Sequence, residues 1–529
     1  MIGMSNATYT RACPSQSLTI ERLFRTTIST SQHNTISQFL IDAETEMRHY
    51  QNEIDNFKSK IVLRENKRSH LSKKMAKYRS LLSPVHKMPP EVLGNVFAFA
   101  CEEQTVSFRP DHIPQPLLLS AVCGRWREVA VATPFLWTSI NINFAAWEKV
   151  EHYRHLLQQT QLFLERSKIS PLHIYLNFNY KLPRDDAVST LTVLVSHSNR
   201  WQRLILAGVT QDCLRQAVFS PLEQYGLPML VHLDVSGLTD QDTEDADFVC
   251  QLFAHCPSLT SLRMKNDEVN PVRTSLPWQQ IKMLETYFMY ESGLNLVPRC
   301  PNLERLALYC VGGVSEDPIP VTHVISPVQR LSIDAQAEDD ATCIFMNSTL
   351  RELSSIEIRG IDENSGPWTN LQTAFADFLA RSSCSLTSIT LDRLPITDTQ
   401  ATRLLQLLPT LTTLHIGECR SATTNRIITT TFLDRFSDIT EMSTAPFLPQ
   451  LAHVKFVLHA EGLDVGVLSR ALTSRWVPDT EYALTLGIAC TQSIDIVFVK
   501  EGSHIENVRS SLEWMVGAGA RLTVSKLHE

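Results

Sequence analysis

Cysteine, histidine and acidic side chains are the groups that could perform catalysis or bind a metal in this chain. The twelve cysteines are scattered and no two have C-x-x-C spacing, so the sequence indicates neither a zinc site nor a redox pair. It contains no glycine-rich phosphate loop, no H-E-x-x-H and no G-x-S-x-G. His152 and His155, a lone pair three residues apart, are typical of a helix surface. We therefore expect no enzyme activity, no metal and no cofactor.

Composition indicates a large protein of a reducing intracellular compartment. The 529 residues suggest two to four domains, and 43% hydrophobic residues can fill large cores. A net charge of −8 argues against a protein that is organised around nucleic acid. Free cysteines within apolar runs indicate a reducing compartment, cytoplasmic or nuclear, and no apolar run is long enough for a membrane span.

Residues 1–35 are predicted to be a disordered polar leader. The first forty residues are rich in Ser and Thr, carry arginines and contain one acid, Glu21. The same composition is typical of a mitochondrial transit peptide, and that alternative stays open.

Residues 36–83 are predicted to form one long helix. No proline or glycine occurs between Ile36 and Ser83, and Pro84 ends the helix. Apolar residues recur every seven positions, which is the a/d pattern of a coiled-coil seam. The seam consists of Leu40, Met47, Ile54, Ile61, Met75 and Leu82, with Ala43, Tyr50, Phe57, Leu71 and Tyr78 between them.

The sequence leaves two partners open for this seam: a second copy, giving a homodimer through residues 40–82, or another part of the same chain. Arg64 and Arg68 interrupt the seam and weaken the case for a tight homodimer. The stretch from Lys58 to Arg79 carries nine Lys or Arg and one acid. Solvated helix faces commonly have this composition, and since no aromatic residues are interleaved for base stacking, nucleic acid is the less favoured partner.

Residues 84–140 carry the pattern of three short helices. Pro89 and Pro90 stand where a first helix would begin, Pro116 precedes a second helix, and Gly124 separates it from a third. Apolar residues at Val92, Leu93, Val96, Phe97 and Ala100 follow helical spacing. About fifty residues are too few to bury a self-sufficient core, so this module needs a partner surface.

Three fragments of the module occur together and in order: MPPEVLGNVF from Met88, LLSAVCGRW from Leu118 and PFLW from Pro134. Together they resemble the F-box, which docks the Skp adaptor of SCF-type ubiquitin ligases, and in particular the expanded F-box family of basidiomycete fungi. Met88 replaces the usual leucine, which conserves volume. The loop from Glu102 to Gln115 is longer than is usual in the family. The resemblance implies that the adaptor contacts Met88, Pro89, Val92, Leu93, Val96, Phe97, Leu118, Val122 and Trp126.

Residues 141–475 repeat one motif, in which leucine is followed by two variable residues and then by two apolar residues around a variable one. Examples are LVHLDVSG (230–237), NLERLALY (302–309) and TLTTLHIG (410–417). The middle apolar residues stand at positions 204, 233, 262, 284, 306, 331, 356, 389, 414 and 454. A period near 25 residues with a Leu-x-x-Leu-x-Leu core is the signature of leucine-rich repeats.

The sequence therefore predicts an α/β fold: a long N-terminal helix, the F-box-like module, and an irregular leucine-rich-repeat solenoid with parallel strands on its concave face and helices outside. Helical returns are expected over Asp247–Cys256, Asn370–Arg381 and Thr399–Leu408. Residues 476–529 are predicted to cap the array with strands ALTLGI, IDIVFV and RLTV and one helix. An ordinary α/β domain is the alternative.

Alternate side chains of a strand face opposite ways, so the residues between the leucines should line the concave face. We expect a target protein to contact Arg263, Lys265, Arg305, Tyr309, Arg330, Glu357, Arg359, Asp392, His415 and Lys455 there.

The resemblance and the repeats together predict a non-catalytic substrate-recognition subunit of an SCF-type ligase, bound through the Skp adaptor to a cullin and presenting an unknown target protein. The alternative is a repeat scaffold that works without a ligase, in which residues after 150 cover the apolar stripes of the helical module.

Overall fold

The computed structural model describes residues 24–25, 27–102, 107–109, 112–147, 150–179, 185–238, 252–265, 275–288, 292–310, 323–361, 366–419, 426–437, 446–459, 463–500 and 503–527. The chain divides into two compact units, Met1–Leu93 and Gly94–Glu529, and each unit is treated by itself below.

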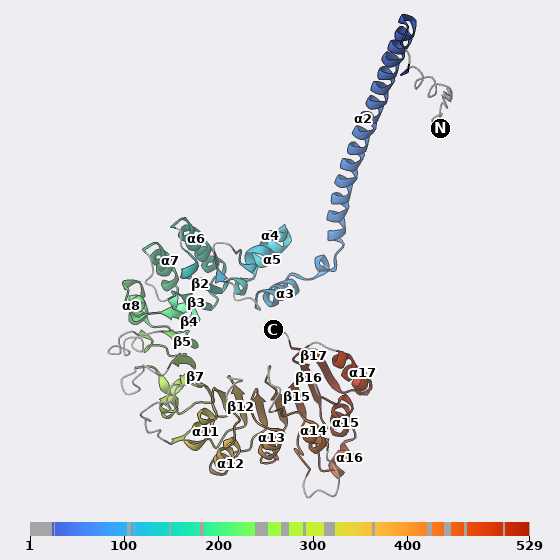
Figure 1. Cartoon of the computed structure of the whole chain (residues 1–529). Coiled ribbons are helices and arrows are strands. Elements are labelled where there is room, and N and C mark those ends of the chain that lie inside the picture. Colours follow the sequence, from blue (N-terminus) through green and yellow to red (C-terminus); the bar gives the residue numbers. More distant parts are fainter. Residues whose placement is uncertain are drawn as a thin grey trace. The chain divides into compact units, whose positions relative to one another are not determined.

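The first unit is dominated by helix α2, Thr30–Leu81 (Figure 1). The predicted long helix is present, but it begins six residues before residue 36, because Ser29 and Gln32 form a capping box. The Gln32 backbone N–H donates to Ser29 Oγ at 3.4 Å, and the Ser29 N–H donates to Gln32 Oε1 at 3.1 Å. Residues 30–35 are therefore helical, which corrects the predicted boundary of the leader. Residues 1–23 lie outside the described residues.

A short 3₁₀ helix, η1 (Pro84–Lys87), follows α2 and leads to α3 (Pro90–Glu102). Helix α3 begins in the first unit and continues into the second. The second unit then contains α4 (Gln115–Val122), α5 (Gly124–Ala132) and the 3₁₀ turn η2 (Pro134–Trp137), in agreement with the predicted three helices.

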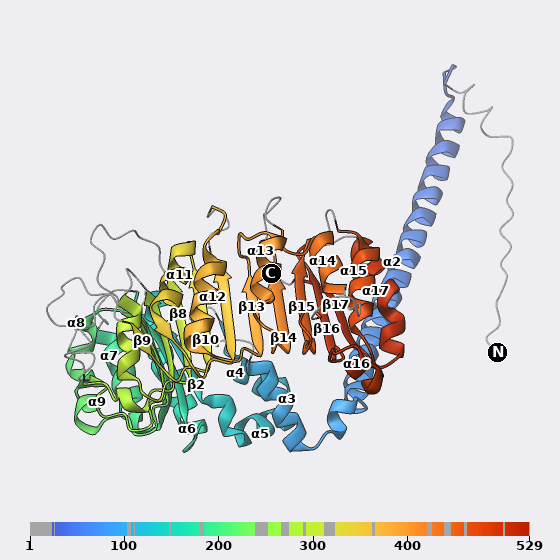
Figure 2. The same cartoon turned by 90° about the horizontal axis from the view of Figure 1, so that it is seen from below.

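Among the described residues, fifteen strands form one parallel sheet in chain order, with β9 and β11 apart from it in a two-stranded sheet. Figure 2 shows strands of the large sheet side by side. Its strands are β1 (Ser107–Phe108), β2 (Ser139–Asn143), β3 (Leu172–Asn177), β4 (Trp201–Val209), β5 (His232–Leu238), β6 (Ser261–Lys265), β7 (Met283–Phe288), β8 (Arg305–Cys310), β10 (Arg330–Ala335), β12 (Ser355–Gly360), β13 (Ser388–Asp392), β14 (Thr413–Gly417), β15 (His453–Leu458), β16 (Ser493–Phe498) and β17 (Arg521–Lys526). The small sheet pairs Val324–Ile325 with Ser348–Thr349.

The register of the sheet confirms the repeat positions read from the sequence. Leu204 pairs with Leu233, Leu233 with Leu262, and so on through positions 284, 306, 331, 356, 389, 414 and 454. The same row extends to Ile140 and Ile174 before the first predicted copy and to Ile494 and Leu522 after the last. One buried apolar row therefore runs through nearly the whole sheet.

Helices cover the outer face of the curved sheet (Figure 1). They are α6 (Val150–Arg166), α7 (Asp185–Val195), α8 (Gln211–Leu214), α9 (Ser220–Tyr225), α11 (Glu338–Met346), α12 (Leu371–Ser382), α13 (Asp398–Leu405), α14 (Thr430–Ser437), α15 (Val465–Arg475), α16 (Thr480–Thr485) and α17 (Ser503–Gly517), with 3₁₀ turns at Phe144–Ala146, Ser198–Arg200, Ala217–Phe219, Trp278–Gln280 and Ser292–Arg299. Helices α12 and α13 are two of the predicted returns. The third, Asp247–Cys256, lies half outside the described residues.

The core lies between the sheet and these helices. Phe345 of α11 contacts Phe375 and Phe378 of α12, with ring centroids 5.3 and 5.2 Å apart, and all three side chains are buried. Neighbouring helices thus pack on one another as well as on the strands, so each repeat depends on the next for burial.

The long loop from Glu102 to Gln115 contains strand β1, which the sequence did not indicate. Strand β1 pairs with β2, and the Trp147 indole N–H donates to the Phe108 carbonyl at 3.0 Å. Because β2 begins at Ser139, the sheet starts within the segment assigned to the helical module.

The C-terminal prediction was wrong in one element. ALTLGI is not a strand, because Asp479 accepts hydrogen bonds from the Glu481 and Tyr482 backbone N–H groups at 2.9 and 3.1 Å and starts helix α16. Strands β16 and β17 continue the same ladder, so this segment extends the sheet.

Replacing Gly360 by Ala should lower the free energy of unfolding by about 1–3 kcal/mol, because the added Cβ would lie 2.3 Å from the Arg393 carbonyl oxygen. Gly366→Ala is the matched control, since a Cβ there meets nothing within 4 Å. Urea unfolding followed by circular dichroism measures both. Equal stability of the two variants would contradict the close approach of the chain at Gly360.

Candidate functional site

Two surfaces carry the residues that the sequence singled out: the concave face of the sheet, and the outer side of the helical module, whose residues up to Leu93 belong to the first unit. The described residues contain no cluster of three or more His, Cys, Asp or Glu side chains placed to hold a metal ion. In the same part of the chain, no helix is both long and apolar enough to cross a membrane.

On the concave face, Arg263 joins three neighbouring strands. Its guanidinium lies 3.8 Å from Asp234 on β5 and 3.5 Å from Glu285 on β7, and it donates to the Tyr287 hydroxyl at 2.9 Å. It also lies 5.1 Å from the centroid of the Tyr309 ring, which stacks on Tyr287. Burial disfavours the charge of Arg263, but these tyrosines and Asp234 outweigh it and raise the pKa of the guanidinium.

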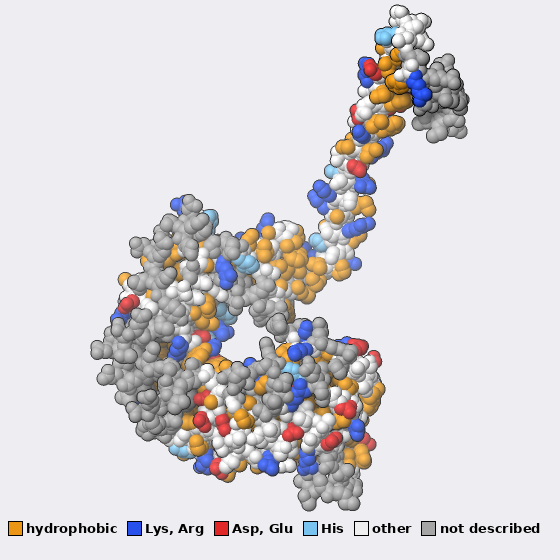
Figure 3. All heavy atoms as spheres, viewed as in Figure 1, with side chains coloured by type: hydrophobic (Ala, Val, Ile, Leu, Met, Phe, Trp, Pro, Cys, Tyr) orange, Lys and Arg blue, Asp and Glu red, His pale blue; other side chains and the backbone are white. Residues whose placement is uncertain are grey.

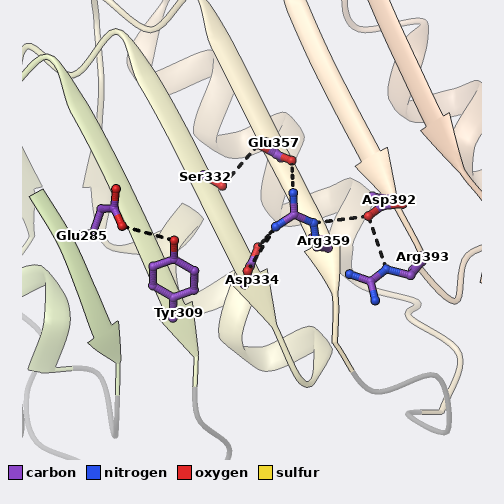
Figure 4. A network of polar contacts seen from close by, with 8 residues as sticks. All are labelled: Glu285, Tyr309, Ser332, Asp334, Glu357, Arg359, Asp392 and Arg393. Atoms are coloured by element: carbon purple, nitrogen blue, oxygen red, sulfur yellow. Dashed lines mark hydrogen bonds and ion pairs between the residues drawn. The ribbon is translucent and has the colours of Figure 1, made fainter. Parts of the chain in front are cut away.

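Arg359 is a second shared cation, four strands further along the sheet and two residues further along its own strand (Figure 4). It donates to Asp334 on β10 at 3.0 Å, to Asp392 on β13 at 3.2 Å and to Glu357 on its own strand. Arg393 donates to Asp392 as well, at 3.3 Å. Burial raises the pKa of Asp334 and Arg359 offsets this only in part. The ion pair with Arg359 therefore compensates the burial of Asp334 incompletely.

These contacts divide the ten residues predicted to bind a target. Five are engaged in cross-strand contacts within the chain: Arg263, Tyr309, Glu357, Arg359 and Asp392. The other five are Lys265, Arg305, Arg330, His415 and Lys455, and of these Arg305, Arg330 and Lys455 are the exposed ones. His415 is half-buried, and burial followed by the charge of Lys455 lowers its pKa.

Sequence reasoning missed Glu285, Tyr287 and Arg393. The first two lie on β7, whose motif IKMLETYF was recognisable as a weaker copy of the repeat, so its outward positions could have been found. Arg393 follows β13 with a backbone φ of 54°, and nothing in the repeat pattern indicates that it turns back to Asp392.

The first residues of the strands form a row in which two basic side chains are adjacent. Arg305 on β8 and Arg330 on β10 face each other directly across the ladder, and both are exposed. Like charges in this arrangement are unfavourable. Further along the row, burial and then the charge of Arg203 lower the pKa of His232 to about 4, so its imidazole is neutral at physiological pH.

The helical module is held together by its own aromatic side chains. Phe97 on α3 contacts Trp126 on α5 with ring centroids 4.9 Å apart, and a Cβ at Gly94 would lie 3.3 Å from Thr133 Oγ1. Trp137 is fully buried, and its indole donates to the Ala130 carbonyl at 2.8 Å. Each of these helices therefore has one side that is buried within the module.

Their other side is apolar and exposed. The exposed fractions are 46% for Val92, 46% for Val96, 41% for Leu118 and 59% for Val122. Phe99, which the sequence analysis missed, lies on the same stripe as Val96 and is 73% exposed. Figure 3 shows hydrophobic side chains gathered over this part of the chain.

Two residues that the resemblance assigned to the adaptor contact are buried in the structure. Leu93 and Phe97 are only 1% exposed, because one residue further along a helix rotates the side chain by about 100° away from Val92 and Val96. Met88 and Trp126 are half-buried, and Pro89 is exposed and accepts a hydrogen bond from the Leu93 N–H.

Comparisons with known proteins do not identify a family. No family model matches the chain, and no curated protein does. Among solved structures, a structural-genomics target from Bacteroides fragilis matches with 12% identity over 60% of this chain and 68% of that one, at a TM-score of 0.28. A TM-score this low carries no argument about fold or function.

Replacing Arg359 by Met should lower the free energy of unfolding by about 2 kcal/mol at pH 7, because three carboxylates then lose their shared cation. Without Arg359 the folded-state pKa of Asp334 rises further. A carboxyl whose pKa is raised on folding stabilises the folded chain at low pH, and this stabilisation is lost as the pH rises. The difference in unfolding free energy between the variant and the unmodified chain should therefore shrink as pH falls toward about 4. Urea unfolding at both pH values measures this. Arg305→Met is the control and should cost nothing; a deficit that does not depend on pH would contradict the network.

Proposed function

We propose that this chain is the substrate-recognition subunit of an SCF-type ubiquitin ligase, an F-box protein whose leucine-rich-repeat array holds the target. The observation that carries the proposal is the exposed apolar side of the helical module. Val96, Phe99, Leu118 and Val122 are large apolar residues on helices whose opposite sides are already buried. Clustered exposure of this kind marks interaction sites.

The alternative of a self-contained scaffold requires residues after 150 to cover that side. The exposed fractions of Val96 and Val122, 46% and 59%, speak against such a cover. The resemblance of MPPEVLGNVF, LLSAVCGRW and PFLW to the F-box selects the Skp adaptor as the partner. In this proposal Leu93 and Phe97 have a different role from the one that the resemblance implies: they are buried, with Phe97 packed on Trp126, while Val92 and Val96 contact the adaptor.

The concave face suits a protein target. The contacts of Arg263 and Arg359 hold six strands in a defined arrangement of side chains, which lowers the entropy cost of binding. The exposed Arg305 and Arg330 repel each other across the ladder, and an acidic segment of a target would relieve that repulsion. This chain would contribute proximity, since it holds a target near the ubiquitin-conjugating enzyme and needs no catalytic residue of its own.

Val96→Asp should abolish co-purification of the full chain with a Skp-type adaptor, because a carboxylate would have to be buried in the interface. Since Val96 is 46% exposed, the change should cost about 0.5 kcal/mol of stability or less. Val516→Asp is the matched control: Val516 is a helical valine that is 51% exposed, on α17. Pull-down with purified adaptor measures binding, and circular dichroism verifies folding.

Undiminished binding by folded Val96→Asp would refute docking through this side of the module. Failure of the unmodified chain to bind any Skp-type adaptor would leave the ligase-independent scaffold as the function.

Replacing Arg305 and Arg330 by Glu should remove the acidic targets from the proteins captured by the chain, while adaptor binding stays unchanged. Proximity labelling in cells would compare this variant with the unmodified chain. Arg351→Glu, which reverses an exposed arginine outside the sheet, is the control. An unchanged set of captured proteins would rule out a role for this pair of arginines.

A further inference from the structure

Helix α2 presents an apolar seam that nothing in the proposed function uses. The helix has 52 residues and none of its side chains is buried. Seam residues Met47, Ile54, Phe57 and Ile61 are 68%, 46%, 61% and 57% exposed. A helix of about 78 Å with such a seam is typical of one strand of a coiled coil.

The charges of α2 are divided between its two halves. Residues 36–57 contain five acids and one arginine, whereas residues 58–79 contain nine Lys or Arg and one acid. In a parallel pair of two copies, each half would face the half of the same sign. In an antiparallel pair, the acidic half of one copy would lie along the basic half of the other, which is favourable.

The two arginines on the seam also favour the antiparallel orientation. Arg64 and Arg68 occupy a d and an a position, so a parallel pair would place Arg64 against Arg64 and Arg68 against Arg68. When a positions are aligned with d positions in an antiparallel pair, Arg64 lies opposite Ile54 and Arg68 opposite Tyr50. Both guanidinium groups then meet the acidic half of the partner helix.

The flanking g positions agree with this alignment. In the antiparallel pair Glu46 faces Lys74 and Glu53 faces Lys67, while Lys60 at a g position and Lys58 at an e position meet their own copies near the crossing point. A parallel pair would join Glu53 to Lys58 and Lys60 to Glu65, but it would also place Lys74 against Arg79 where the positive charge is densest. We therefore propose that two copies of this chain associate through α2 as an antiparallel coiled coil, with the partner helices crossing near Ser59.

The unmodified full chain tests this by mass and by cross-linking. Light scattering should give twice the 59.8 kDa of one chain. A mixture of isotopically heavy and light chains treated with a carbodiimide should yield heavy–light links between Glu46 and Lys74. On one straight helix these residues lie about 42 Å apart, too far for a direct link within a chain.

Charge reversal at Lys74 separates the two orientations by sign. Lys74→Glu should weaken an antiparallel dimer about tenfold, because Glu46 then faces another carboxylate at two places in each dimer, and the added Glu46→Lys should restore it. In a parallel dimer the same Lys74→Glu would strengthen association, because position 74 would face Arg79. Ile61→Asp should dissociate the dimer, whereas Ser59→Asp, at an outer f position, should not.

A monomer at tens of micromolar protein would overturn the proposal, and so would a dimer that Lys74→Glu strengthens. Association that appears only with added RNA or DNA would assign the basic half to nucleic acid and would equally overturn it. None of these outcomes depends on adaptor binding, so they test this inference separately from the proposed function.

Discussion

The parallel, in-register ladder is the constraint on which the second unit depends. A single apolar row passes from Ile140 to Leu522, and every member is paired with the equivalent residue of the next strand. Because helices such as α11 and α12 pack on each other as well as on the strands, no repeat buries its leucines alone. The order of strands in the sheet equals their order in the chain for the same reason, since each strand can only be completed by its successor.

This geometry also determines the polar side of the sheet. Side chains one position away from the apolar row are brought within contact distance of their equivalents on neighbouring strands, so charges there cannot be independent. Around Arg263 and Arg359 the charges alternate in sign across adjacent strands and neutralise each other. At Arg305 and Arg330 the charges on adjacent strands have the same sign, so two cations lie side by side. The concave face therefore combines a part in which charges are paired across strands with a part in which two like charges are adjacent.

The two apolar surfaces outside the sheet differ in how they are supported. The exposed stripe of α3 has a fixed base, because Phe97 is packed on Trp126 behind it. Helix α2 has no such base: capping at Ser29 and helical periodicity define it, and none of its side chains is buried. A preorganised stripe suits docking of a folded partner, whereas a long isolated seam requires a second helix along its length.

The sequence by itself determined the long helix, the three short helices and the repeat register, because these depend on local spacing: seven-residue recurrence, prolines at helix starts, and leucines at a fixed offset in each repeat. It could not show that Leu93 and Phe97 face inward, that Arg263 and Arg359 are shared among strands distant in the chain, or that β1 lies within an unpatterned loop. Those outcomes depend on which side of a helix meets its neighbour and on contacts between residues 22 to 39 positions apart. Only the tertiary structure brings such residues together.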